Sequence, residues 1–83
     1  MLKAIIWTKD YCDYCDKAKQ ELKLRDYDIE ERNISGPDWS KKDLQKLIPD
    51  VKTVPQIFIF NKHIGGYNKL MTYFEETTSN YGH

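Results

Sequence analysis

The chain has too few cysteines to be held together by disulfides. Its 83 residues include two cysteines, Cys12 and Cys15, and a bridge between positions three apart closes almost no loop. Such a bridge removes little entropy from the unfolded chain, so its value must lie in chemistry rather than in stability. A structural zinc site is disfavoured as well, because it needs four ligands and the sequence has no second cysteine or histidine pair.

The sequence also lacks a membrane-spanning run and a surplus of charge. No apolar stretch approaches the roughly 20 residues that cross a bilayer, and residues 1–8 are too short for a secretory signal. The 13 basic and 13 acidic residues cancel, which disfavours a nucleic-acid or membrane-binding surface. We therefore expect a cytoplasmic protein with one domain over residues 1–83, because a chain of this length can bury one small core.

Apolar patterning in the first half of the chain predicts two strands around a helix. Residues 3–8 form a short β-branched run that is typical of a buried strand. The segment that follows carries Cys15, Ala18 and Leu22 at helical spacing, so both cysteines lie where a strand passes into a helix. Residues 27–34 indicate a second strand, which is ended by a Ser-Gly-Pro sequence.

The second half predicts a helix, a strand pair and a last helix. Ser40 and Asp43 resemble a capping box before a helix that Pro49 ends. Residues 56–60 form the clearest strand, 62–64 a short partner strand, and Asn68 is the expected cap of the final helix, with residues 79–83 as a frayed tail. The order β-α-β-α-β-β-α predicts an α/β, thioredoxin-like fold, a four-stranded mixed sheet with helices on both faces.

The position of Cys12 at the start of a helix favours thiol chemistry. Only a thiolate attacks a disulfide, and unpaired backbone N–H groups at a helix start stabilise that anion. Lys9 adds a nearby positive charge, with Lys17 or Lys19 as weaker helpers, whereas Asp13 opposes the thiolate. We expect a Cys12 pKa below the free value of about 8.5, attack by Cys12 on a disulfide, and resolution by Cys15 or a second thiol.

The sequence resembles the glutaredoxin family over nearly the whole chain, and three blocks carry the resemblance. They are residues 8–15 (TKDYCDYC), residues 53–59 (TVPQIFI) and residues 63–67 (HIGGY). The resemblance implies a thioredoxin fold, glutathione as the reducing partner, and reduction of protein disulfides or glutathione mixed disulfides. It also implies a monomer that needs no bound metal, with ribonucleotide reductase as a family-typical client.

Site roles follow from the resemblance residue by residue. Cys12 matches the nucleophile and Cys15 the resolving cysteine, with Tyr14 the aromatic residue beside the active sulfur. The remaining matches concern glutathione. Lys9 matches a cation that meets a glutathione carboxylate, Thr53 and Val54 match a strand-like backbone contact, and Pro55 matches the cis-proline. Gly65 and Gly66 match a glycine pair that lets the chain come close, and Tyr67 and Asn68 lead into the last helix, whose start receives a carboxylate.

The chain departs from the family pattern at two positions. Asp13 replaces the proline of well-known dithiol members, and some members without that proline hold an iron–sulfur cluster, so cluster binding is a second hypothesis. Lys69 replaces an acid that meets the glutathione amino group, which adds repulsion there. A redoxin reduced by thioredoxin reductase is therefore a third hypothesis.

Overall fold

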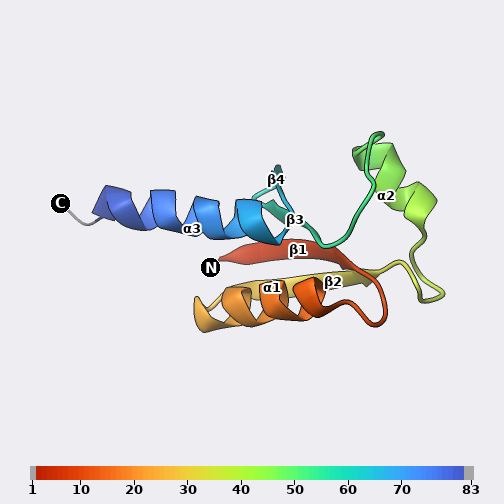
Figure 1. The fold of residues 1–83 in the computed structure, drawn as a ribbon, viewed down its shortest axis with the longest axis horizontal. Coiled ribbons are helices and arrows are strands. Elements are labelled where there is room, and N and C mark those ends of the chain that lie inside the picture. Colours follow the sequence, from red (N-terminus) through yellow and green to blue (C-terminus); the bar gives the residue numbers. More distant parts are fainter. Residues whose placement is uncertain (1, 82–83) are drawn as a thin grey trace.

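A computed structural model describes the backbone of residues 2–81, and the side chains of residues 2–77. Four strands form one mixed sheet in the order β2-β1-β3-β4, in which β1 pairs in parallel with β2 and antiparallel with β3, and β3 pairs antiparallel with β4 (Figure 1). The elements are β1 (Lys3–Thr8), α1 (Asp13–Leu24), β2 (Asp28–Asn33), α2 (Lys41–Leu47), β3 (Gln56–Ile59), β4 (Lys62–Gly65) and α3 (Tyr67–Tyr81). The thioredoxin-like layout predicted from the sequence is confirmed.

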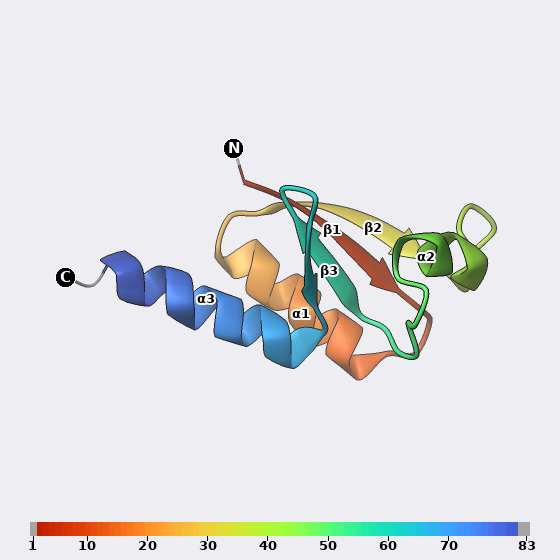
Figure 2. The same cartoon turned by 90° about the horizontal axis from the view of Figure 1, so that it is seen from above.

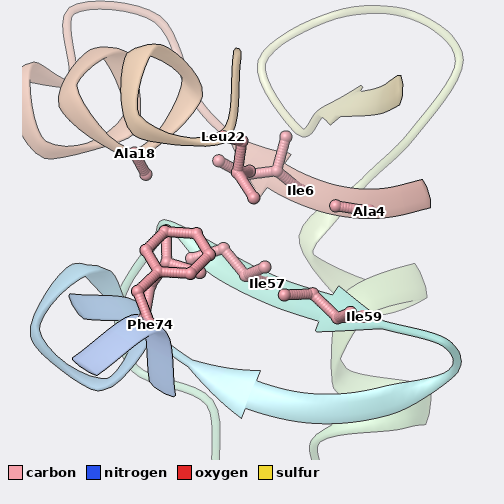
Figure 3. Close-up of a cluster of buried hydrophobic side chains, with 8 residues drawn as sticks. Ala4, Ile6, Ala18, Leu22, Ile57, Ile59 and Phe74 are labelled. Carbon is pink, nitrogen blue, oxygen red and sulfur yellow. The ribbon is translucent and has the colours of Figure 1, made fainter. Parts of the chain in front are cut away.

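One face of the sheet packs against α1 and α3, which run side by side along it (Figure 2). Alternate residues of β1 and β3 point into this layer, where they meet the apolar side of α1 and the side chain of Phe74 from α3 (Figure 3). The buried cluster consists of Ala4, Ile6, Ala18, Leu22, Ile57, Ile59, Leu70 and Phe74. This core holds α1, the helix that carries both cysteines, against the centre of the sheet.

The opposite face carries a smaller core beside α2. Trp7 packs there with Leu44 and Val51, and the Trp39 ring meets the Trp7 ring edge-on at a centroid distance of 5.2 Å. The predicted capping box is confirmed, because the Ser40 side chain accepts from the Asp43 N–H while the Asp43 carboxylate accepts from the Ser40 N–H. Helix α2 lies at the end of the sheet to which β1 points (Figure 1).

Several predicted boundaries were wrong. Asn68 does not cap α3, since the helix begins at Tyr67 and the carbonyl of Gly66 accepts the first helical hydrogen bond, from Leu70 N–H at 3.0 Å. The strand β4 runs one residue further, to Gly65, and leaves no room for a polar cap between strand and helix. Of the predicted tail, residues 79–81 continue α3, and residues 82–83 lie outside the described part of the chain.

The longest helix of the structure is α3, with 15 residues. It extends beyond the sheet at the end opposite to α2 (Figure 1). Among the described residues, no helix is both long enough and apolar enough to traverse a bilayer.

Candidate active site

Sheet topology brings three distant segments to one end of the molecule. Strand β1 runs toward this end, and because β3 is antiparallel to it, Gln56 at the start of β3 pairs with Trp7 near the end of β1. Strand β4 returns, so that Gly65 pairs with Ile57 and α3 begins at the same end. The loop before Cys12, the segment before β3 and the start of α3 therefore meet.

Cys12 is the N-cap of α1, as the strand-to-helix reading predicted. Its sulfur accepts a hydrogen bond from the backbone N–H of Cys15 at 3.2 Å, and its carbonyl accepts from Asp16 N–H at 3.1 Å. The sulfur therefore takes the place that a serine or aspartate oxygen usually occupies at a helix start. The N–H of Cys15 has no partner within the helix and points at the sulfur, which favours the anionic form of the sulfur.

Cys12 and Cys15 are joined by a disulfide in this structure, with their Cα atoms 5.2 Å apart. Cys12 is 9% exposed and Cys15 is 1% exposed. Cys15 is thus the more buried of the two, as predicted, and an incoming molecule reaches Cys12 first. Among the described side chains, no group of three or more histidine, cysteine, aspartate or glutamate residues is placed to bind a metal ion.

The segment before β3 faces the active sulfur. The Val54–Pro55 peptide bond is cis, as the family resemblance implied, and the Val54 carbonyl oxygen lies 3.9 Å from Cys12 Sγ. Thr53 is exposed, while its carbonyl accepts a hydrogen bond from the Gln56 side chain at 3.0 Å. A partly exposed segment outside the sheet ladder, beside a reactive sulfur, can pair with the backbone of a bound peptide.

A pocket of about 510 Å³ opens beside this segment and unites most of the predicted site. The Tyr14 and Tyr67 rings both line it and contact each other, at a centroid distance of 5.7 Å. The volume suits a molecule of tripeptide size. The predicted residues that line it are Tyr14, Thr53, Val54, Pro55, Gly66, Tyr67 and Asn68, and Lys69 lies with them. The geometry brings these residues together, and their contact with glutathione stays a prediction.

Lys9 lines a second pocket, of about 210 Å³, which also borders this segment. Thr53 and Val54 line both pockets, so the two are neighbours. Two further lysines, Lys41 at the start of α2 and Lys52, line the second pocket and were missed. Lys52 directly precedes the Thr-Val-Pro block and could have been found from that position, but no sequence signal marks Lys41.

The other lysines considered for Cys12 have different partners. Lys19 forms ion pairs with Glu31 at 3.2 Å and with Asp16 at 3.6 Å, so its charge is already engaged. Lys17 lies over the Tyr14 ring, 5.1 Å from its centroid, and so supports the wall of the larger pocket. Lys9 is thus the predicted helper that stays available to the site.

The loop that leads into Cys12 is held by hydrogen bonds to the end of β2. Asp10 accepts from the Asn33 amide at 2.9 Å and donates its backbone N–H to Ser35 Oγ at 3.1 Å, while Ser35 N–H donates to Asn33 Oδ1 at 2.7 Å. Between this clamp and α1, Tyr11 takes a left-handed conformation with φ of 55° and a fully exposed side chain. The clamp fixes where α1 begins and therefore where Cys12 lies.

A buried hydroxyl joins β1 to β2 directly before this loop. Thr8, 1% exposed, donates to Glu31 Oε2 at 2.6 Å, and Lys19 donates to both carboxylate oxygens of Glu31. Burial alone raises the pKa of Glu31, but the bonds from Thr8 and Lys19 outweigh it, so the pKa lies below its ordinary value of 4.5. The strand end that precedes the site is therefore anchored by an ionised carboxylate.

Comparison with known families identifies relatives of this chain. The family model described as Glutaredoxin matches residues 4–64. Glutaredoxin 1 of Escherichia coli K12 is 32% identical over 81 residues, covering 90% of this chain and 95% of that protein. Glutaredoxin-C4 of Arabidopsis thaliana is 35% identical over 78 residues, covering 88% of this chain. This chain spans 56% of the length of the Arabidopsis protein.

Solved structures show the same fold. The crystal structure of glutaredoxin 1 from Francisella tularensis with cacodylate matches with a TM-score of 0.78 and 27% identity, covering 95% of this chain and 99% of that one. A buckwheat glutaredoxin–glutathione complex also matches with a TM-score of 0.78, at 24% identity, over 92% of this chain and 71% of that one. At that identity the second match supports the fold alone.

Proposed function

This chain belongs to the glutaredoxin family, and on that premise we propose that it is a glutathione-dependent thiol–disulfide oxidoreductase with Cys12 as its nucleophile. The observation that carries the proposal is the placement of the Cys12 sulfur. It lies at the start of α1, within hydrogen-bond distance of a helical N–H, and it faces the Val54 carbonyl beside the cis-proline. A sulfur in such a place is accessible, stabilised as an anion, and adjacent to a backbone that can hold the attacked disulfide.

The reaction proceeds by two successive disulfide exchanges. The Cys12 thiolate attacks one sulfur of the substrate disulfide, the substrate S–S bond breaks, and the leaving thiolate takes up a proton. The Cys15 thiolate then attacks Cys12, which forms the Cys12–Cys15 disulfide seen in this structure and releases the second substrate thiol. Two electrons pass to the substrate and leave the protein oxidised.

Two molecules of glutathione restore the dithiol. The first, as a thiolate, attacks Cys12, so that Cys15 is released as a thiol and glutathione is bound to Cys12 through a disulfide. The second attacks the bound glutathione sulfur, which frees the Cys12 thiolate and yields oxidised glutathione. The same second step reduces a glutathione mixed disulfide of a substrate once its glutathione has moved to Cys12.

The two pockets that share Thr53 and Val54 offer a binding site for glutathione. The Val54 backbone would pair with the cysteine residue of glutathione, in the pocket walled by Tyr14 and Tyr67. One glutathione carboxylate would lie at the start of α3, where free N–H groups attract anions, and the other near Lys9.

We further propose that protein disulfides in the cytoplasm are clients of this protein acting as a monomer, and that ribonucleotide reductase is the first candidate client. The family resemblance supports this choice. A Cys15→Ser variant tests it, because without the resolving thiol the mixed disulfide between Cys12 and its client persists. Recovery of that adduct from cells would identify the client and the compartment.

The test of the function is reduction of a small glutathione mixed disulfide in the presence of glutathione and glutathione reductase. We expect turnover by the wild type and by Cys15→Ser, and none by Cys12→Ser, because only Cys12 is needed when glutathione resolves the intermediate. An inactive wild type would remove glutathione as the reductant. Reduction by thioredoxin reductase, or brown colour after anaerobic purification, would then identify one of the other two activities of such a site.

A further inference from the structure

The groove around the active sulfur carries an uneven charge. Its two pockets share Thr53 and Val54 and are therefore neighbours. Among the described residues, no aspartate or glutamate lines either pocket, although acidic and basic residues are equal in number over the whole chain. Lysines line both pockets, and they are Lys9, Lys41, Lys52 and Lys69.

These four groove lysines are not neutralised by the protein itself. Over the described side chains, the ion pairs engage Lys19, Arg25 and Arg32, each with an acidic partner within 4 Å. None of the groove lysine side chains takes part in a hydrogen bond or an ion pair within this part of the chain. Their ammonium groups are therefore available to a bound molecule.

Lys69 stands where a lysine is electrostatically unfavourable. It lies in the first turn of α3, which contains no acidic residue, and a cation at a helix start is repelled by the positive end of the helix dipole. The first carbons of the Lys69 side chain also lie close to the backbone of Gly65, because a Cβ at Gly65 would be 2.9 Å from Lys69 Cβ. Nothing among the described side chains offsets this charge, whereas an anionic substrate group would.

The acidic residues near Cys12 do not compensate for the lysines. The Asp10 carboxylate accepts from Asn33, and Asp16 pairs with Lys19 on α1. Asp13 is exposed on the same helix and lines neither pocket. The acidic residues near Cys12 therefore leave the charge of the groove lysines uncompensated.

We propose that this groove selects disulfides carried on acidic peptide segments, with aspartate or glutamate on both sides of the reacting cysteine. The proposal rests on the proposed function and deepens it. An acidic residue on one side of the cysteine meets Lys69, and one on the other side meets the cluster of Lys9, Lys41 and Lys52. Glutathione itself satisfies the lysines with two carboxylates, but its ammonium group finds no acid in either pocket.

The test compares three cystine peptides that differ at the residues flanking the cysteines, which are glutamate, glutamine or lysine. Their reduction is measured with glutathione, glutathione reductase and the wild-type protein at low and at high salt. We expect kcat/KM to fall from the glutamate to the lysine peptide by roughly tenfold at low salt, mainly through KM, and the difference to shrink at high salt. Lys69→Gln and Lys52→Gln should each reduce the ratio of kcat/KM for the glutamate peptide to kcat/KM for the lysine peptide.

Lys46→Gln is the matched control, because Lys46 is an exposed lysine of α2 that lines neither pocket. It removes the same charge and should leave the ratio unchanged. Equal kcat/KM for the three peptides, a preference for the lysine peptide, or an equal loss of selectivity in Lys46→Gln would overturn the selectivity while leaving the oxidoreductase intact. Failure to reduce any peptide or the small glutathione mixed disulfide would instead overturn the proposed function, and the selectivity with it.

Discussion

Replacing Thr8 by valine tests the hydrogen bond that anchors the end of β1 beside the site. Thr8 is 1% exposed and donates to Glu31 at 2.6 Å, and valine has a similar shape but no donor. A hydrogen bond to a charged group contributes about 1.5–3 kcal/mol. Because Glu31 is partly exposed and keeps Lys19 as a partner, we expect a loss of about 1.5 kcal/mol in unfolding free energy, or roughly 6–12 °C in Tm.

The pH dependence of stability separates this bond from a simple packing effect. Burial raises the pKa of Glu31, and the bonds from Thr8 and Lys19 more than offset it, so the folded-state pKa lies below 4.5. A carboxyl with a lowered folded pKa stabilises the fold above its unfolded pKa, and this stability is lost as pH falls through the folded value. Thr8→Val removes one cause of the lowering, so we expect the variant to lose less stability in acid than the wild type.

Urea denaturation at neutral pH and at about pH 3 provides the measurement. Thr72→Val is the control, because Thr72 is exposed on α3, and it should cost less than about 0.5 kcal/mol. In a Glu31→Gln background, Thr8→Val should cost less than in the wild type, since the charged acceptor is gone. A cost of Thr8→Val that is the same at both pH values and in both backgrounds would show that the reasoning is wrong.

Two further predictions concern the core and the alkaline limit of stability. Leu22→Ala should lower the unfolding free energy by about 3–5 kcal/mol, because this side chain is fully buried between α1 and the sheet. Leu24 on the same helix is 76% exposed, so Leu24→Ala should lower it by less than about 0.5 kcal/mol. Equal losses in urea denaturation would contradict the assigned core. Burial raises the pKa of Tyr27 above 10.0, so the fold should lose stability as pH rises past that value. Tyr27→Phe should reduce this loss in alkaline denaturation. An unchanged slope of unfolding free energy against pH in the variant would refute the prediction.

Much of the fold could be predicted because its strands and helices have distinct periodicities. The strand at residues 3–8 was predicted with its observed limits, and the capping box of Ser40 and Asp43 placed the start of α2 correctly. The start of α3 was misplaced because a polar residue near a helix start normally signals a cap. Here the chain passes directly from β4 into the helix, so the N-cap position falls on Gly66, which has no side chain to accept from the first-turn N–H groups.

The site was predictable where residues are close in sequence and less so where the fold joins them. The two cysteines, the cis-proline and the pocket around Tyr14 were anticipated from contiguous motifs. Pairing of Lys19 with Glu31 could not be foreseen, since the partners lie on different elements and meet only when β2 pairs with β1. Lys41 enters the site for the same reason, through the position of α2 at the end of the sheet.

Net charge is a weak guide to the surface that a substrate meets. A formal charge of zero sums over the whole chain, but a bound peptide feels charges within about one Debye length, about 8 Å at physiological salt. Ion pairing has already neutralised Lys19 of α1 and Arg32 of β2, while Lys69 and the lysines around Lys9 have no acidic partner among the described side chains. The balance that argued against a charged partner therefore hides a positive groove around Cys12, and substrate charge rather than total charge is the property on which kcat/KM should depend.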